Sequence, residues 1–199
     1  LYSGIYYLES RGYRPEEIFR IGKTLKNKAK RYYTVDNSIY ENRKSAGNVI
    51  DKEAGILNRG NLTRLKNFLN RAAQGERLTV GFIGGSITQG FAATAPDKCY
   101  AARTVAWLRK VFPNTEFDYV NAGIGATNSQ FGAARVQEDL LCRLPDLAMV
   151  EFSVNDHCTP HDMETYEGLI RQIYGSRSCP AMVLLHSVYY DTGKSAAYY

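Results

Sequence analysis

The feature that most constrains the fold is an alternation of short apolar runs with segments of helical periodicity over residues 78–188. Almost continuously apolar runs of this length are typical of strands that helices cover on both faces. Strands that alternate with helices form βαβ units, in which the strands are parallel. The sequence therefore predicts an α/β fold around a parallel sheet. The expected strands are 78–83, 117–120, 147–152 and 181–188, and the expected helices between them are 100–112, 130–144 and 163–174.

The residues before this pattern have a different composition, rich in tyrosine and in basic side chains. We interpret residues 1–60 as an N-terminal extension and residues 61–199 as the main domain. Residues 1–77 hold 16 of the 25 Lys+Arg but only 8 of the 20 Asp+Glu. The basic run at 23–31, which two tyrosines follow, could bind nucleic acid. No nucleic-acid motif accompanies it, so we favour a solvated helix face and expect no nucleic-acid partner.

Two further helices are expected ahead of the first strand. One covers residues 14–25, with Pro15 in its first turn. The other covers residues 62–73, where Asn61 is a suitable cap and Gly75 a suitable stop. No apolar run is long enough to span a bilayer and no signal-peptide pattern is visible, so we expect no membrane partner and predict no compartment.

Three of the expected strands are followed by polar, glycine-containing loops. They read GGSITQG from residue 84, NAGIGATNS from residue 121 and SVNDH from residue 153. In open parallel sheets, ligands bind beyond the carboxyl ends of the strands. The three loops therefore predict an active site at one edge of the sheet.

Three common loop motifs are excluded by residue identity. A P-loop requires lysine after its last glycine, but Phe91 follows Gly90 here. Neither glycine loop supplies the G-x-G-x-x-G of dinucleotide-binding proteins. The G-x-S-x-G of α/β-hydrolases fails because Thr88 stands where its second glycine should be.

What remains is a serine on a tight turn after a strand. Ser86 alone would be read as a turn or helix-cap residue, but the three loops together favour a nucleophile. A serine nucleophile needs a base, and its tetrahedral intermediate needs hydrogen-bond donors. The backbone N–H groups of Gly123 and Gly125 and the side-chain amide of Asn155 could supply those donors.

Over residues 78–188 the chain resembles the SGNH (GDSL-like) hydrolase superfamily of esterases, lipases and carbohydrate deacetylases. Its first block resembles FIGGSITQG, which implies Ser86 as nucleophile, with Gly85 in place of the usual aspartate. The third block resembles FSVND, which implies Asn155 as the side-chain oxyanion donor, with Ser153 in place of the usual glycine.

The second block of the superfamily resembles NAGIGATNS and implies a backbone oxyanion donor in this loop. Residue type favours Gly125, whereas a gapless register against other members of the superfamily favours Ala126. A backbone N–H group serves in either case, so both residues remain candidates.

The resemblance implies a three-layer α/β/α sandwich with a flavodoxin-like parallel sheet, and a serine esterase that needs no metal or cofactor. Within the superfamily, the three blocks look most like a bacterial branch that includes acetylxylan and other carbohydrate esterases. The expected substrate is therefore a small acyl ester, in the first place an acetyl ester on a carbohydrate.

The catalytic base is not visible in the sequence. The superfamily ends in an Asp-x-x-His block, and no such block occurs here; the histidines are His157, His161 and His186. We read the first two as polar loop residues near the cleft and His186 as a structural residue of the last strand. A dyad rearranged around His157 or His161 is an alternative with less support.

The superfamily has five strands and the pattern supplies four, so we expect the final strand and helix to lie outside this sequence. On that basis the 199 residues alone should be inactive until a C-terminal segment or another chain completes them. Two rival hypotheses are a non-catalytic carbohydrate- or ligand-binding protein on the same scaffold, and an interaction arm formed by residues 1–60.

Overall fold

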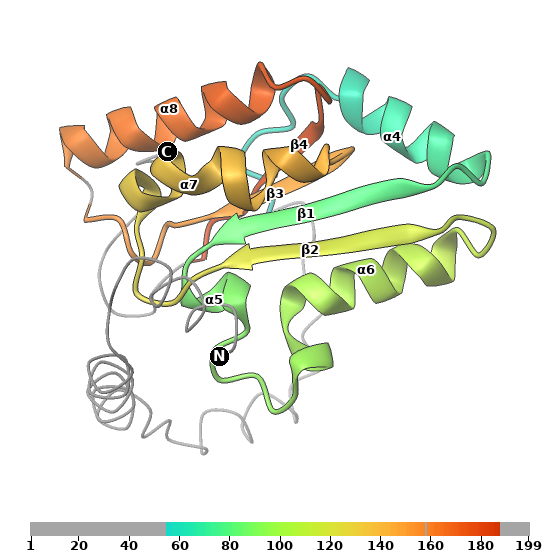
Figure 1. Ribbon diagram of the computed structural model, residues 1–199, viewed down its shortest axis with the longest axis horizontal. Coiled ribbons are helices and arrows are strands. Elements are labelled where there is room, and N and C mark those ends of the chain that lie inside the picture. The colour runs from blue at the N-terminus through green and yellow to red at the C-terminus, as the bar shows by residue number, and fades with distance from the viewer. Residues whose placement is uncertain (1–54, 158, 188–199) are drawn as a thin grey trace. The chain divides into compact units, whose positions relative to one another are not determined.

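The computed structural model describes residues 55–157 and 159–187, and those from Leu57 onward belong to one compact unit. Their four strands form one parallel sheet in the order β2-β1-β3-β4 (Figure 1). This is the strand order of flavodoxin-like sheets, so the predicted fold class is confirmed. The expected helix at 14–25 and the basic run at 23–31 lie outside the described residues. The strands are β1 (Leu78–Gly84), β2 (Phe117–Gly123), β3 (Leu147–Glu151) and β4 (Ala181–Leu184).

Helices cover both faces of the sheet, which gives three layers. In Figure 1, α7 and α8 lie along one side of the sheet and α6 along the other. The apolar side chains form one cluster with α4 and α6 and a second cluster with α7 and α8. The helices are α4 (Thr63–Ala73), α5 (Ser86–Gln89), α6 (Tyr100–Val111), α7 (Ser129–Asp139) and α8 (Pro160–Tyr174), with 3-10 turns η1 (Pro96–Lys98) and η2 (Leu141–Arg143).

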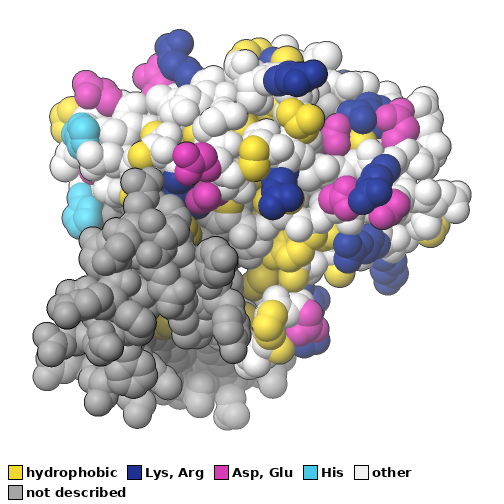
Figure 2. All heavy atoms as spheres, viewed as in Figure 1, with side chains coloured by type: hydrophobic (Ala, Val, Ile, Leu, Met, Phe, Trp, Pro, Cys, Tyr) yellow, Lys and Arg dark blue, Asp and Glu magenta, His cyan; other side chains and the backbone are white. Residues whose placement is uncertain are grey.

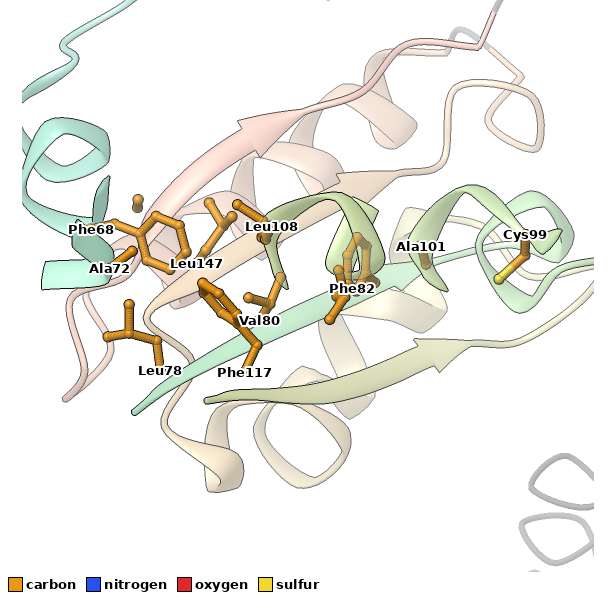
Figure 3. Packing of buried hydrophobic residues seen from close by; sticks show 12 residues of the cluster. Phe68, Ala72, Leu78, Val80, Phe82, Cys99, Ala101, Leu108, Phe117 and Leu147 are labelled. Carbon is orange, nitrogen blue, oxygen red and sulfur yellow. The ribbon is translucent and has the colours of Figure 1, made fainter. Parts of the chain in front are cut away.

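Strand β1 is central and supplies side chains to both apolar clusters. Val80 and Phe82 point into the cluster that α4 and α6 cover, which Figure 3 shows from close by. Ile83 belongs to the opposite cluster. Gly81 faces that side as well, and a Cβ there would overlap the Leu140 side chain. Burial on both faces explains why the run is apolar without a period of two.

Helix α4 has the stop signal expected from the sequence. Gly75 follows its last turn with φ 80°, the left-handed conformation in which glycine is favoured. At the other end, Asn61 Oδ1 accepts a hydrogen bond from the Thr63 N–H group at 2.9 Å. The N-cap residue of α4 is Leu62, one residue later than expected.

Four other boundaries differ from those predicted by three residues or more, and one of them is the end of β2, which lies at Gly123 rather than residue 120. Helix α7 ends at Asp139 rather than near residue 144, because Leu140 adopts φ −126° and the chain turns into η2. Helix α8 begins at Pro160 rather than residue 163. Its start is a capping box in which Thr159 and Asp162 hydrogen-bond each other's backbone N–H groups, a signal that the sequence contains. The last strand ends at Leu184 and not at residue 188, so His186 lies beyond β4.

Charged side chains in the described part of the chain are mixed rather than gathered by sign. Figure 2 shows basic and acidic side chains intermingled over the face it presents. Several are paired, including Arg77 with Asp118 and Arg71 with Asp146. None of the helices described here combines the length and apolar character needed to cross a bilayer.

One carboxylate lies in the core, at the end of β3. Glu151 is fully buried; its Oε1 accepts a hydrogen bond from the Ser153 hydroxyl at 3.0 Å, and its Oε2 has no hydrogen-bond partner among the described residues. Burial raises the pKa of this carboxyl, and the hydrogen bond from Ser153 opposes that rise. The folded protein therefore favours the protonated form more than the unfolded chain does.

This buried carboxyl predicts a pH-dependent effect of Glu151→Gln. In the unfolded chain the Glu151 carboxyl ionises near its usual pKa of 4.5. The wild type therefore loses stability as pH rises from that value towards the raised pKa of the folded protein. The amide does not titrate. The stability of the variant relative to the wild type should therefore increase as pH rises above 4.5, measured by urea unfolding. An unchanged difference would show that the carboxyl titrates normally.

A second prediction concerns Gly168 in the middle of α8. A Cβ added there meets no atom within 4 Å, and alanine is a better helix former than glycine. Gly168→Ala should raise the free energy of unfolding by about 0.5–1 kcal/mol. Gly75→Ala is the control, since its left-handed conformation should make the same substitution destabilising by about 1–2 kcal/mol. Equal effects of the two changes in urea unfolding would contradict this account.

Candidate active site

The three polar loops leave the sheet side by side. Gly84, the last residue of β1, is level with Gly123 at the end of β2 and with Glu151 at the end of β3. Because the strands are parallel neighbours, the loops that follow them begin at the same edge. The predicted convergence of the three loops is therefore seen in the structure.

Helix α5 rests directly on two of these strand ends. A Cβ at Gly123 would lie 2.6 Å from the Thr88 carbonyl carbon and 2.7 Å from Gln89 Cα. A Cβ at Gly84 would overlap the Thr88 hydroxyl and the Glu151 carbonyl oxygen. A side chain at Gly123 would meet the backbone of α5, and one at Gly84 would meet the Thr88 side chain of α5 and the backbone of β3.

The two glycines before the serine leave room for neighbouring side chains. Neither Gly84 nor Gly85 has a positive φ. Gly84 makes room for Thr88, and Gly85 makes room for Asn155.

Ser86 is the first residue of α5 and is half-buried. Within the described residues its hydroxyl makes no hydrogen bond, and its Oγ is not among the buried unpaired atoms. As the first residue of the helix, it also has no helical partner for its N–H group. Both groups are therefore available to a ligand at the strand ends.

Beneath Ser86, Thr88 fixes the short helix. Its fully buried hydroxyl is 3.0 Å from the Tyr100 hydroxyl, and its carbonyl oxygen accepts a hydrogen bond from Asn121 Nδ2 at 2.8 Å. Burial raises the pKa of Tyr100 to about 12, so this phenol stays protonated and able to donate. These bonds tie α5 to α6 and to β2.

Asn155 lies against Gly85. A Cβ on Gly85 would overlap Asn155 Oδ1 and stand 3.2 Å from its Cγ. The Oδ1 atom is buried and has no hydrogen-bond partner in the part of the chain that the structure describes. Nδ2 is not among the buried unpaired atoms and donates no hydrogen bond within the described residues. The amide therefore has an accessible donor close to the turn that carries Ser86.

The loop after β2 lies beside Ser86 and offers two N–H groups of different status. A Cβ on Gly125 would be 3.7 Å from Ser86 Cβ. The Gly125 N–H group donates to Gln89 Oε1 at 2.9 Å, whereas the Ala126 N–H group has no hydrogen-bond partner within the described residues. Ala126 has φ 61°, an uncommon conformation for a residue other than glycine. The Gly123 N–H group donates to Asn121 Oδ1 at 2.9 Å.

Two further contacts hold the loops together. The fully buried Asp156 accepts a hydrogen bond from the Ser129 N–H group at 2.9 Å, which joins the third loop to the start of α7. The buried Arg135 of α7 pairs with Asp139 at 2.8 Å and donates to the Gly84 carbonyl oxygen at 3.3 Å. The edge of the sheet is therefore anchored from the α7 side as well.

The histidines do not complete a triad within the described residues, because none of them is hydrogen-bonded to Ser86. His157 and His161 are exposed, on either side of the first residue of α8. His186 is half-buried, with its ring 6.4 Å from that of Tyr166, and burial lowers its pKa. Nor do three or more His, Cys, Asp or Glu side chains of this part of the chain gather as metal ligands.

Sequence reasoning missed Gln89 and the spacing role of Gly85. A polar residue at the end of GGSITQG, in a segment expected to be a loop, was the only signal for Gln89. Its contact with Gly125 joins residues 36 apart in the chain, which a local pattern does not reveal.

Comparisons with known proteins agree with this fold and motif order. One similar structure is a two-domain esterase (CEX) active on acetylated mannans, co-crystallised with mannopentaose. It is 52% identical to this chain with a TM-score of 0.72, and the match covers 73% of this chain and 40% of the esterase chain. A second structure of a two-domain esterase (CEX) active on acetylated mannans is 53% identical with a TM-score of 0.70, covering 71% and 38%. The chain thus spans about 40% of the length of this relative. No curated protein matches significantly.

The family model described as the GDSL-like lipase/acylhydrolase family matches residues 82–198, more than half of the chain. The match begins within β1, just before the glycine pair, and includes all three loops. The resemblance predicted from the three blocks is confirmed: this chain belongs to the GDSL-like lipase/acylhydrolase family.

Proposed function

We propose that the protein is a serine esterase that removes acetyl groups from carbohydrate, with Ser86 as its nucleophile. The observation that carries the proposal is the meeting of three loops at adjacent strand ends. Among these loops are a serine hydroxyl and amide donors that have no hydrogen-bond partner within residues 55–157 and 159–187. The relative active on acetylated mannans, at 52% identity, supports acetylated mannan as the first substrate to test.

In the proposed reaction, Ser86 Oγ attacks the carbonyl carbon of the acetyl ester while a base takes the hydroxyl proton. The tetrahedral intermediate expels the sugar hydroxyl, leaving an acetyl group on Ser86. Water then attacks this acyl-enzyme and releases acetate. Because none of the described histidines is hydrogen-bonded to Ser86, the base is not assigned among them.

Three groups are proposed to stabilise the oxyanion: the Ser86 N–H group, Asn155 Nδ2 and a backbone N–H group of the loop after β2. Each preorganised donor can contribute about 10²–10³-fold to turnover. The Gly125 N–H group is already bonded to Gln89 Oε1, while that of Ala126 has no partner within the described residues. This difference supports Ala126 as the third donor.

Replacement of the nucleophile tests the proposal directly, in a form of the protein whose wild type releases acetate. Ser86→Ala should lower kcat on acetylated mannan and on aryl acetates by about 10⁴–10⁶-fold, since the acyl-enzyme can no longer form. Acetate release is the measurement, and circular dichroism shows whether the fold is retained. Gly168→Ala, far from the chemistry, is the control. Turnover that survives in the purified Ser86→Ala protein would exclude Ser86 as nucleophile.

The choice between Ala126 and Gly125 predicts opposite effects of Gln89→Met. If Ala126 donates, loss of the Gln89 bond frees the loop and misplaces the donor, and kcat should fall by about 10–10²-fold with a smaller change in KM. If Gly125 donates, the same change releases its N–H group, and kcat should stay the same or rise. Kinetics on an aryl acetate distinguish the two, with the melting temperature as a check on folding.

A further inference from the structure

We propose that Gly85 is a positioning residue, which sets the place of the Asn155 amide by having no side chain of its own. The inference rests on the proposed function, because it concerns a donor to the oxyanion. It assigns a role to the residue before Ser86, where the related blocks usually carry aspartate.

The contact is close on two sides. A Cβ on Gly85 would overlap Asn155 Oδ1, stand 3.2 Å from Asn155 Cγ and lie 3.3 Å from the Thr127 carbonyl oxygen. The Asn155 side chain therefore packs directly over Gly85 Cα, and the loop after β2 closes the other side. A methyl group has no free volume here, and the end of the Asn155 side chain is the part able to move.

Gly85 does not need the left-handed conformation in which glycine is favoured, because its φ is −84°, with ψ −148°. Its N–H group donates to the Glu151 carbonyl oxygen at 3.2 Å, and its own carbonyl accepts from the Gln89 N–H group at 3.0 Å. A methyl group at Cα leaves both bonds possible. Gly85→Ala should therefore fold, unlike a substitution at Gly84 or Gly123, which would meet backbone atoms.

Packing on Gly85 is what holds the Asn155 amide. The backbone of Asn155 is fixed by a hydrogen bond from its N–H group to the Phe152 carbonyl oxygen at 2.9 Å. Its side chain, in contrast, makes no hydrogen bond within the described residues, and Oδ1 is buried without a partner. With no bond to restore its orientation, the amide should turn or shift when a methyl group occupies its place. A displacement of about 1 Å at a catalytic group can cost about 10²-fold in rate.

A double-mutant cycle tests this coupling. Asn155→Ala should lower kcat on an aryl acetate by about 10²–10³-fold, and Gly85→Ala should lower it by about 10–10²-fold with a smaller change in KM. Because both changes act on the same amide, Gly85→Ala should have little further effect in the Asn155→Ala background. Gly168→Ala is the matched glycine-to-alanine control and should leave kcat unchanged.

A second readout does not depend on activity. The side-chain NH₂ pair of Asn155 is identified in a ¹⁵N–¹H spectrum as the pair that Asn155→Ala removes. Gly85→Ala should shift this pair, and Gly168→Ala should not. An unshifted pair would overturn the inference even if the wild type proved to have no esterase activity.

The kinetic outcomes separate the two proposals. An active wild type with an active Ser86→Ala variant overturns the proposed function, and the spectrum then decides on Gly85. A normal kcat for Gly85→Ala, with Ser86→Ala inactive, overturns the role of Gly85 and leaves the esterase proposal in place. If the loss of kcat in Gly85→Ala multiplies with the loss of kcat in Asn155→Ala, Gly85 acts through some other group. That result also overturns the proposed role of Gly85.

Discussion

The direct contact of helix α5 with the backbone at Gly84 and Gly123 is the constraint on which the rest of the site depends. Because neither glycine has a side chain, the backbone of α5 lies on Gly123 and its Thr88 side chain lies on Gly84, and Ser86 begins the first turn of the helix at that edge. Thr88 and Asn121 fasten this position with hydrogen bonds. The nucleophile candidate is thus placed by the sheet itself rather than by a long loop, which favours a constant orientation of its hydroxyl.

The sequence was sufficient to predict the layers, the parallel sheet and all four strands, because buried strands and amphipathic helices leave periodic patterns over several residues. Sequence patterns were less reliable for helix ends, whose position can depend on the conformation of a single residue. Helix α7 stops where Leu140 leaves the helical conformation, and nothing in its local pattern signals this. The start of α8 was signalled by Thr159 and Asp162, so that difference arose from an overlooked capping box rather than from missing information.

For the site, sequence reasoning named Ser86, Asn155 and the loop that holds Gly125 and Ala126, because strand-end position and residue type are local properties. It could not reveal which backbone N–H group is already bonded, since that depends on Gln89 reaching a residue far away in the chain. Nor could it distinguish a glycine needed for a turn from one needed for space. At Gly85, the need for space beside Asn155 becomes visible only in three dimensions.

The left-handed backbone of Ala126 has a consequence for how this family member can change over time. An alanine at φ 61° costs about 1–2 kcal/mol relative to its preferred conformations, so the loop gives up some folding stability at this residue. Substitutions that relax this turn would be neutral or favourable for folding and harmful to the donor proposed there. With Ala126 as the proposed donor, selection for folding stability and selection for turnover would act against each other at a single exposed residue of the loop.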